Sequence, residues 1–403
     1  MSHTPLAVIG GGPAGLRAAE VASADGLKVT LFDAKRSVGR KFLVAGKGGL
    51  NISNAEPIET FATRYSGPDQ PDVFWEHALA GFDNHAIRGW AARLDVGTFV
   101  ARNGRVYPKA LKAAPLLRRW VQLIKSQGVT FAMKHRLRDI TPGSPHTLVF
   151  DTPDGRHETT AEAVILALGG GSWPDTGSDG RWVSLAEKLG IAINPLTAAN
   201  CGWEVDWPSA FLDAHEATPL KNLHLRVGNE EAIGELIITS YGLEGGPLYQ
   251  LGPALRAANP PAITIDFKPS FTIERLVAKM ESARRNFLHE ATHRWKLPTA
   301  AGDLLDHFRG PIQSAEQLAP LAKAFTLPLT GPRPLAEAIS SAGGVRWTEL
   351  DDQLMLRRFP GVCLAGEMID WEAPTGGYLM QGCFATGTLA ARSVVAWMAT
   401  HNR

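Results

Sequence analysis

The sequence has few cysteines and no metal-binding spacing, and both absences exclude kinds of site. Its three cysteines, Cys201, Cys363 and Cys383, lie far apart among 403 residues and form no CxxC pair. This excludes a dithiol redox centre and a metal knuckle of that spacing, and it is typical of a reducing compartment. The twelve histidines show no HExxH-type spacing, so we expect no metal.

Long apolar runs and a net charge of one sign are also missing. The 41 basic and 40 acidic residues give a formal net charge of +1, from which we expect neither nucleic acid nor an anionic membrane as partner. No apolar run of about 18 residues occurs. The first residues have no basic stretch and no cleavage site of the signal-peptide kind. We therefore expect a cytoplasmic protein that acts on a small molecule, with its oligomeric state left open.

The N-terminal residues contain the pattern of a β-α-β unit. An apolar run at 6–9 ends in glycines, an alanine-rich helix is expected at 16–24, and a second strand at 28–32 is closed by Asp33. About 30 residues are the minimum for a right-handed parallel crossover. A helix is expected at 113–126, and strands are expected near 129–133, 148–150 and 163–168.

The pattern changes near residue 191 and returns to the α/β type near residue 336. Between these points short strand-like runs are separated by Pro and Gly turns, followed by helical stretches that include one at 272–288. We therefore predict an α/β fold with a discontinuous nucleotide-binding domain of the Rossmann kind, made of residues 1–190 and 336–403. An inserted β-rich and helical substrate domain is predicted at 191–335.

The first functional motif is G-x-G-x-x-G after the first strand. Its glycines suit a tight turn, close approach to a pyrophosphate, and close packing of helix on strand. The amino end of the helix favours an anion, and Asp33 stands where an acid binds a ribose diol. The alternative is a glycine turn without ligand. The residues predicted to contact a dinucleotide here are Gly10, Gly12, Pro13, Ala14, Gly15, Asp33 and Ala34.

The second motif is the glycine-rich and basic stretch 39–54, which follows Asp33 directly. Its backbone donors and cations suit phosphate, ribityl hydroxyls or the polar edge of a flavin ring, and the alternative is a solvated surface loop. The predicted contacts are Arg40, Lys41, Gly46, Lys47 and Asn51.

Two further glycine segments follow strands later in the chain. The strand at 163–168 runs into three glycines, which predicts contacts from Ala167, Gly169 and Gly170. Near the C-terminus, the acid and glycines before the last helix predict contacts from Gly366, Glu367, Gly376, Gly377 and Tyr378. Only a long dinucleotide needs so many places where the backbone comes close to the ligand, which favours FAD as the cofactor. We expect NAD(P)H to bind only transiently.

At these residues the sequence resembles a family of bacterial NAD(P)/FAD-dependent oxidoreductases related to aminoacetone oxidase and a bile-acid enone reductase. The matching segments include 10–15, 39–54, Gly104 to Pro108, 167–180, 239–247, 343–345 and 366–378. The resemblance implies an FAD domain of the glutathione-reductase type with an inserted β-rich and helical domain. The chain departs from the family pattern at Leu50 and Glu244, which are features of a sub-branch.

We therefore expect an FAD-dependent oxidoreductase, a cytoplasmic flavoprotein that passes a hydride through flavin N5. The donor is NAD(P)H or an amine-like compound, and the acceptor is a small organic molecule or oxygen. The alternative is a flavoprotein with a structural, sensing or partner-dependent electron-transfer role; an RNA-binding role is disfavoured by the net charge. Catalytic candidates are Lys47, Tyr241 and Tyr378, although a phosphate contact for the lysine and a core position for the tyrosines are alternatives.

Overall fold

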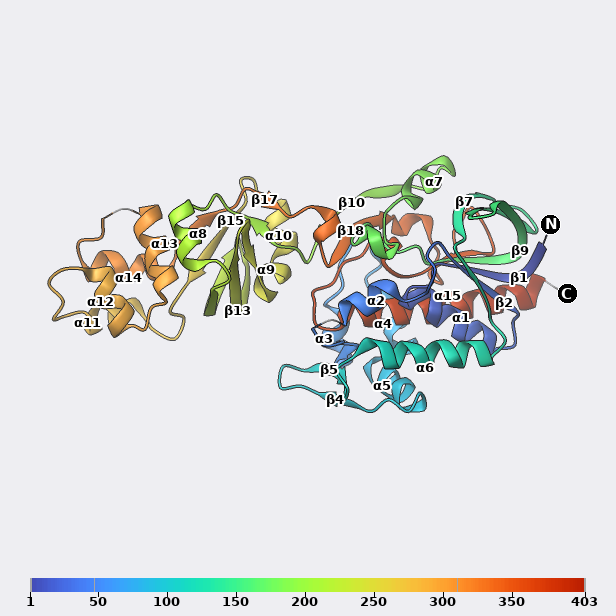
Figure 1. Ribbon diagram of the computed structural model, residues 1–403, viewed down its shortest axis with the longest axis horizontal. Helices are drawn as coiled ribbons and strands as arrows, with labels where there is room; N and C mark the ends of the chain where they lie inside the picture. The colour runs from blue at the N-terminus through green and yellow to red at the C-terminus, as the bar shows by residue number, and fades with distance from the viewer. Residues whose placement is uncertain (1, 47, 310, 402–403) are drawn as a thin grey trace. The chain divides into compact units, whose positions relative to one another are not determined.

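The computed structural model describes residues 2–46, 48–309 and 311–401, and it divides the chain into two compact units. Unit 1 contains residues up to Thr197 together with Ser340 onwards, and unit 2 contains Ala198–Ile339. Unit 1 is therefore discontinuous, and Figure 1 shows blue and red segments, from the two ends of the chain, within it. The sequence places the domain boundaries after residues 190 and 335.

Unit 1 is built on a seven-stranded sheet. Its order is β6 (Thr130–Met133), β2 (Val29–Asp33), β1 (Ser2–Ile9), β9 (Gly155–Leu166), β8 (His146–Thr152) and β7 (Arg136–Thr141), with β19 (Val362–Leu364) also paired to β9. The pairs β6–β2, β2–β1, β1–β9 and β9–β19 are parallel, while β8 and β7 run antiparallel. The β-α-β unit predicted at 6–33 is confirmed by β1, α1 (Pro13–Ala24) and β2.

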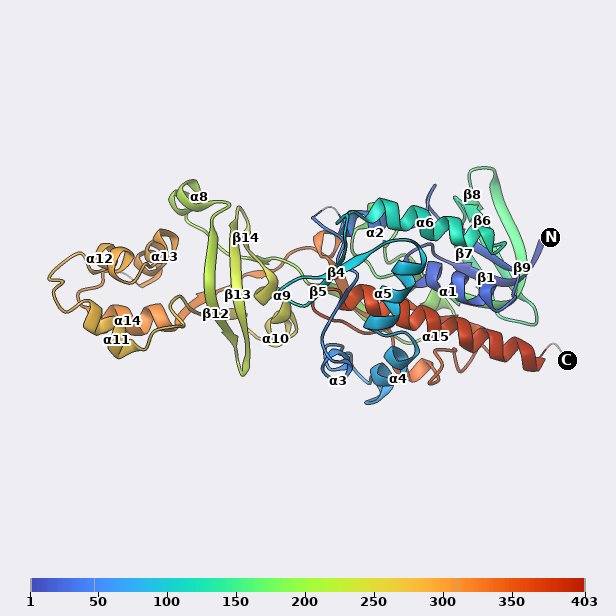
Figure 2. The ribbon, with the colours of Figure 1, turned by 90° about the horizontal axis from the view of Figure 1, so that it is seen from below.

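Both faces of this sheet are buried, as expected for parallel strands. In β1, Leu6 and Val8 belong to one core cluster, and Ala7 and Ile9 belong to another. The first cluster includes residues of α1, α6 (Ala113–Ser126) and α15 (Tyr378–His401), and Figure 2 shows the long α15 running beside α1. The helix predicted at 113–126 is confirmed by α6.

Shorter elements complete unit 1. Its other helices are α2 (Arg40–Ala45), α3 (Ile58–Ala62), α4 (Phe74–Gly81), α5 (Asn84–Arg93) and α7 (Trp182–Lys188), with 3-10 turns η1 (Pro174–Thr176), η3 (Trp347–Glu349) and η4 (Gly366–Met368). A small antiparallel sheet has the order β3 (Ser53–Asn54), β5 (Arg105–Pro108) and β4 (Thr98–Val100). Strands β10 (Ile193–Ala199) and β18 (Ser340–Val345) pair where the chain leaves and re-enters unit 1.

Unit 2 contains a seven-stranded antiparallel sheet with its own hydrophobic core. The order is β16 (Phe325–Pro328), β15 (Ala262–Asp266), β12 (Pro219–Val227), β13 (Glu230–Thr239), β14 (Gly242–Glu244), β11 (Trp203–Glu204) and β17 (Gly331–Pro332). Its helices are α8 (Ser209–His215), α9 (Gly246–Gln250), α10 (Gly252–Ala257), α11 (Ile273–Lys279), α12 (Phe287–Arg294), α13 (Thr299–Arg309) and α14 (Ala315–Lys323), with the 3-10 turn η2 (Leu335–Glu337).

The single helix predicted at 272–288 is wrong, because the structure has two short helices there. Thr272 caps the first helix by accepting a hydrogen bond from the backbone of Arg275, and α11 then ends before the buried Met280. Asn286 takes a left-handed conformation (φ 53°) before α12 begins. A left-handed residue interrupts a right-handed helix, and the polar periodicity of the segment does not reveal it.

Candidate functional site

The glycine segments singled out in the sequence follow neighbouring strands of the unit 1 sheet. β1, β2, β9 and β19 form consecutive parallel pairs, so their carboxyl ends lie at one edge. Gly10 follows β1, Ala167 follows β9, and Gly366 comes just after β19, while Asp33 ends β2. The topology therefore gathers segments from both ends of the chain at one edge of the sheet.

The turn between β1 and α1 is tightly enclosed at two of its glycines. A Cβ atom added to Gly10 (φ +109°) would lie 2.2 Å from the carbonyl oxygen of Ala167, and one added to Gly15 would lie 1.9 Å from that of Gly10. Only glycine fits there. Gly12 differs, because an added Cβ would have no atom of the described residues within 4 Å apart from those of its chain neighbours. The amino end of α1, where Pro13 and Ala14 form the first turn, therefore has open space beside it.

Asp33 closes β2 and fixes the backbone around this turn. Its Oδ2 accepts a hydrogen bond from the backbone N–H of Gly11 at 2.7 Å, and its Oδ1 accepts one from Lys35 at 2.7 Å. Burial raises the pKa of Asp33, and the two backbone donors oppose that rise. Each carboxylate oxygen keeps a second lone pair, so the group retains acceptor capacity for a ligand hydroxyl. Ala34 begins the bend that follows.

Lys41 and Glu367 form an ion pair between α2 and η4. The Lys41 Nζ atom lies 2.7 Å from Glu367 Oε2, and it also donates to Ser172 Oγ at 2.7 Å. The other carboxylate oxygen of Glu367 accepts from the backbone of Ser341 at 2.9 Å, and Ser341 Oγ in turn accepts from the backbone N–H of Gly171 at 2.8 Å. Three of the predicted segments are thus joined through one set of polar contacts.

The loop after α2 meets the amino end of α15. A Cβ on Gly377 (φ +102°) would lie 2.3 Å from the carbonyl oxygen of Ser53. Ser53 Oγ donates to Gln381 Oε1 at 2.8 Å, and the Asn54 side chain donates to the Gly376 carbonyl at 3.4 Å. The predicted loop and the C-terminal glycines are therefore neighbours in space.

The remaining predicted residues of this loop differ in their surroundings. Gly46 packs against α6, because an added Cβ would lie 2.5 Å from the Cβ of Ala113. Arg40 Nε and Asn51 Oδ1 are buried and have no hydrogen-bond partner among the residues that the structure describes. Lys47 lies outside the described residues.

The segment after β9 also takes conformations that favour glycine. Gly169 has φ +74°, and its carbonyl accepts a hydrogen bond from the indole of Trp182 at 2.8 Å. A Cβ on Gly170 would lie 2.2 Å from Ser341 Oγ. Gly170 therefore fits closely into the polar network that holds Glu367, whereas Gly169 is held by Trp182.

The two tyrosine candidates occupy different units. Tyr378 is buried in unit 1, where its ring meets that of Phe61 edge-on at 4.8 Å and its carbonyl accepts from Tyr65. Burial, and then Glu56, raise its pKa. Tyr241 lies in unit 2 between β13 and β14, where its hydroxyl donates to Glu244. Burial, followed by this carboxylate, raises the pKa of Tyr241. Tyr378 therefore belongs to the same unit as the glycine segments, whereas Tyr241 belongs to unit 2.

Sequence reasoning missed residues that organise this edge of the sheet. Ser341 links Gly171 to Glu367, and it precedes the noticed pair Gly343-Gly344 by two residues. In α15, Thr386 Oγ1 accepts from the backbone N–H of Gly366 at 3.0 Å, and a Cβ on Gly387 would lie 2.4 Å from the carbonyl oxygen of Ala14. A glycine and a threonine inside a long helix give no sequence signal of these contacts, because the partners lie outside the helix, 20 residues away for Thr386 and near the other end of the chain for Gly387.

The arrangement fits an extended dinucleotide. The open space at Gly12 lies at a helix amino end, which attracts a pyrophosphate. The unpartnered Arg40 Nε is a buried donor, and Asn51 Oδ1 is a buried acceptor, so each has hydrogen-bonding capacity left for a ligand. Asp33 offers acceptors at the end of the neighbouring strand.

A membrane-spanning helix would need a long apolar stretch, and none of the helices among the described residues has one.

Two solved structures share this fold over almost the whole chain. The 3-ketosteroid-delta4-(5alpha)-dehydrogenase of Rhodococcus jostii superposes with a TM-score of 0.55 and 15% identity, covering 98% of this chain and 97% of that one. A flavocytochrome c3 fumarate reductase gives a TM-score of 0.52 and 14% identity, covering 98% and 78%. The fold is thus an FAD-dependent Rossmann-like α/β fold with an inserted antiparallel β domain.

Two curated relatives match over nearly their full length. The 3-dehydro-bile acid delta(4,6)-reductase of Clostridium scindens is 28% identical over 413 residues, covering 96% of this chain and 98% of the relative. The ribosomal RNA dihydrouridine synthase of Escherichia coli is 22% identical over 407 residues, covering 98% and 99%. The family model described as the HI0933-like protein Rossmann domain matches residues 4–393. The chain therefore belongs to the HI0933-like family of flavin-dependent oxidoreductases.

Proposed function

We propose that unit 1 binds FAD, and that the chain uses it to reduce an electron-poor C=C bond of a small organic acceptor with electrons from NAD(P)H. The observation that supports this most directly is the gathering of four glycine segments at one edge of the parallel sheet. The first segment has open space at Gly12, and the segment after Asp33 has buried atoms on Arg40 and Asn51 without a partner in the described part of the chain. A mononucleotide needs only one such segment.

The residues around the β1–α1 turn would hold the adenosine half of the cofactor. The backbone N–H groups at the start of α1 bind the pyrophosphate, since Gly12 has room for it and the helix dipole favours its charge. Asp33 accepts hydrogen bonds from the ribose hydroxyls while its contacts to Gly11 and Lys35 hold it in place. Lys41 and Glu367 neutralise each other and brace the segments against which the ligand lies.

Residues 48–54 and the amino end of α15 would face the flavin ring. The bound flavin supplies hydride transfer at its N5 atom. Asn51 provides an acceptor for a polar group at the ring edge, and the backbone N–H groups before Tyr378 stabilise negative charge nearby. Gly377 sets this helix end directly against Ser53, so the donors are fixed before any ligand binds.

The acceptor class is supported by the two curated relatives. One is named as a reductase at the delta(4,6) positions of a 3-dehydro-bile acid, and the other as a dihydrouridine synthase. Both names denote addition of two hydrogens to a C=C bond conjugated with a carbonyl group. We therefore place an unsaturated carbonyl compound ahead of oxygen or an amine in this chain's reaction.

Purification tests the cofactor, and anaerobic titration tests the reaction. We expect yellow protein that releases one FAD on denaturation, is bleached by NADH or NADPH, and is reoxidised by an unsaturated ketone or acid in the absence of oxygen. Colourless protein that stays colourless after incubation with FAD would overturn the proposal. Flavin that neither nucleotide bleaches would favour the alternative of a structural, sensing or partner-dependent flavoprotein.

A second acceptor class, a base within RNA, is supported by the distribution of charge. Between Arg88 and Lys125 the chain has nine arginines and lysines and a single acid, Asp95, although its overall net charge is only +1. These residues lie in α5, β5 and α6 and in the loops beside them, all within unit 1 (Figure 2). Retention of ribosomal RNA that weakens steeply with salt would favour this class, and salt-independent or absent binding would exclude it.

A further inference from the structure

Strand β5 presents an arginine and a tyrosine on the face opposite the core. Val106 is fully buried, whereas its neighbours Arg105 and Tyr107 are half-buried, as the alternation of a strand requires. The hairpin that holds them is well fixed. The backbone of Ala101 donates to the Arg105 carbonyl at 2.8 Å, and Gly104 fits against the Asn54 side chain with φ +78°.

This face of β5 lies against the two segments that we propose hold the flavin ring. A Cβ on Gly376 would lie 3.8 Å from the Nε atom of Arg105, and a Cβ on Gly49 would lie 3.7 Å from Cε1 of Tyr107. Both glycines have positive φ, at 127° and 112°. Arg105 is therefore next to the amino end of α15, and Tyr107 is next to the loop after α2.

Among the described residues, neither polar group on this face has a partner of its own. No ion pair or side-chain hydrogen bond joins the Arg105 guanidinium or the Tyr107 hydroxyl to another residue in the described part of the chain. Arg64 shows the contrast, because it pairs with Glu56 at 2.6 Å. Arg105 thus holds an uncompensated charge beside the proposed cofactor site.

The tyrosine belongs to a small exposed apolar surface. Its ring stacks on that of Phe99 in β4, with centroids 5.8 Å apart and planes 26° apart. Phe99 is 38% exposed and Leu111 is 46% exposed. Leu111 and Tyr107 both lie near Gly49. A cation next to an exposed aromatic surface suits a flat apolar molecule with an anionic end.

We propose that Arg105 and Tyr107 form the acceptor subsite, and that it takes a planar unsaturated compound bearing an oxyanion, either a carboxylate or a phosphate. The guanidinium binds the oxyanion through two parallel hydrogen bonds, and the rings of Tyr107 and Phe99 cover the plane of the molecule. This inference rests on the proposed function, because it places the acceptor beside the flavin ring.

The experiment compares three probes on the flavin-loaded protein. Cinnamate has a conjugated C=C bond, a ring and a carboxylate; cinnamamide lacks the charge; and phenyl phosphate replaces the carboxylate with phosphate. Dissociation constants are measured by calorimetry and by the change in flavin absorbance, so the readout does not depend on turnover. The protein forms are wild type, Arg105→Gln, Arg105→Lys and Tyr107→Leu, with Arg102→Gln in the same hairpin as the matched control.

We expect Arg105→Gln to weaken binding of the preferred anion at least tenfold, Arg105→Lys to weaken it less, and Arg102→Gln to leave it unchanged. Cinnamamide should bind weakly to all arginine variants alike, and Tyr107→Leu should weaken both cinnamate and cinnamamide. The tighter of cinnamate and phenyl phosphate identifies the source of the oxyanion. The flavin content and the urea midpoint of each variant report that the fold is intact.

Two results would overturn the inference while leaving the proposed function standing. One is wild-type protein that contains FAD and is bleached by NAD(P)H but binds neither anion more tightly than cinnamamide. The other is Arg105→Gln protein that binds the anion as wild type does. Wild-type protein without flavin would instead be a failure of the proposed function.

Discussion

Gly12 and Gly15 stand in the same turn, but they are required for different reasons. An added Cβ on Gly15 meets a backbone oxygen at 1.9 Å, whereas one on Gly12 meets nothing within 4 Å. Gly12 has φ −77°, a conformation that any residue adopts. The protein itself therefore needs glycine at position 15, while at position 12 only a ligand would need it.

We therefore expect Gly12→Ala and Gly15→Ala to separate ligand binding from stability. Gly12→Ala should leave the urea midpoint of the flavin-free protein unchanged and weaken FAD at least tenfold, about 1.4 kcal/mol. Gly15→Ala should lower the free energy of unfolding by about 1 to 3 kcal/mol, because helix and strand must separate. The measurements are urea unfolding without cofactor and fluorescence titration with FAD. Unchanged FAD affinity in Gly12→Ala would contradict the assignment of the pyrophosphate to this turn.

His146 is a buried histidine at the start of β8. Its Nδ1 accepts a hydrogen bond from the backbone of Gly143 at 3.2 Å, and its Nε2 has no partner among the described residues. Burial lowers the pKa of His146, and the charge of Glu162 opposes this only in part. The folded state therefore binds a proton at this site less readily than the unfolded chain does.

Acid should therefore destabilise the protein through His146. The contribution of neutral His146 to the free energy of unfolding is fully present above the pKa of the unfolded chain, about 6.5. It is lost as the pH falls below that value toward the lowered pKa of the folded state. We expect His146→Asn, which keeps an acceptor for Gly143, to flatten the decline of the unfolding free energy between about pH 6.5 and 5. His85→Asn, at an exposed histidine, is the control. An unchanged slope in His146→Asn would show that other groups cause the decline.

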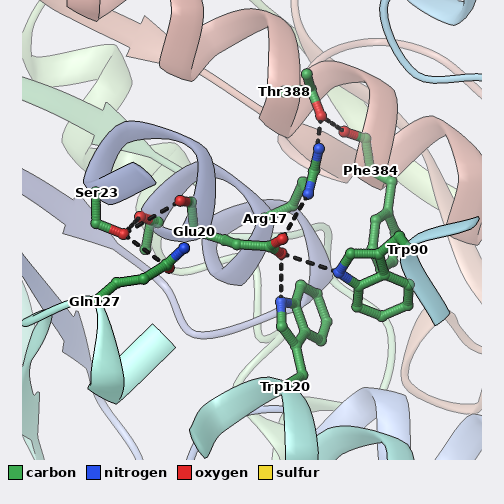
Figure 3. A network of polar contacts seen from close by, with 9 residues as sticks. Arg17, Glu20, Ser23, Trp90, Trp120, Gln127, Phe384 and Thr388 are labelled. Carbon is green, nitrogen blue, oxygen red and sulfur yellow. Dashed lines mark hydrogen bonds and ion pairs between the residues drawn. The ribbon is translucent and has the colours of Figure 1, made fainter. Parts of the chain in front are cut away.

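Side chains from four helices of unit 1 form a polar network around the buried Glu20 and Arg17 (Figure 3). Glu20 of α1 lies 2.9 Å from the guanidinium of Arg17, and its Oε2 accepts hydrogen bonds from the indoles of Trp90 in α5 and Trp120 in α6 at 3.1 and 2.7 Å. Arg17 also donates to Thr388 of α15 at 2.9 Å. Burial lowers the pKa of Arg17, and Glu20 opposes that shift. These contacts fix the helix whose amino end would hold the pyrophosphate.

Removing the charge of Glu20 should therefore lower the free energy of unfolding substantially. Glu20→Gln leaves a buried guanidinium without a counter-ion, and we expect the free energy of unfolding to fall by about 3 to 5 kcal/mol. Thr388→Val removes the hydrogen bonds to Arg17 and to the Phe384 carbonyl but leaves the ion pair, and it should cost about 1 to 2 kcal/mol. The double variant Arg17→Met/Glu20→Gln should recover part of the loss, because no unpaired charge remains. Urea unfolding of the four proteins checks this, and equal losses in the two single variants would contradict it.

At the scale of the whole molecule, the sequence predicts what is local and misses what is distant. The β1–α1–β2 unit can be predicted from the sequence because its glycines, helix and acid lie within about 30 residues. The carboxyl ends of parallel strands lie at one edge of a sheet, which then predicts which segments come together. The Lys41–Glu367 pair joins residues 326 positions apart, and the contact between Ser341 and Gly171 joins residues 170 positions apart. No periodicity encodes such pairs, and the break in the predicted helix at 272–288 depends likewise on a single left-handed residue, Asn286.

The division into two units makes a last prediction about their independence. Every described residue that we assign to FAD lies in unit 1, and the two core clusters of unit 1 contain no residue of 198–339. The small cluster of Ala198, Cys201 and Ala338 belongs to unit 2. Unit 2 has its own core, built from both its sheet and its helices. The chain leaves and returns through the paired strands β10 and β18.

We therefore expect a variant in which a short Gly-Ser linker replaces 198–339 to fold and to retain FAD, because the residues that would hold the cofactor are untouched. The excised segment 198–339 should fold as a mixed sheet and helix domain and remain colourless. Flavin absorbance, circular dichroism and thermal unfolding of both pieces are the measurements, with the intact chain as reference. A shortened chain that is folded but cannot bind FAD would mean that unit 2 contributes to the cofactor site, and the assignment of FAD to unit 1 alone would have to be abandoned.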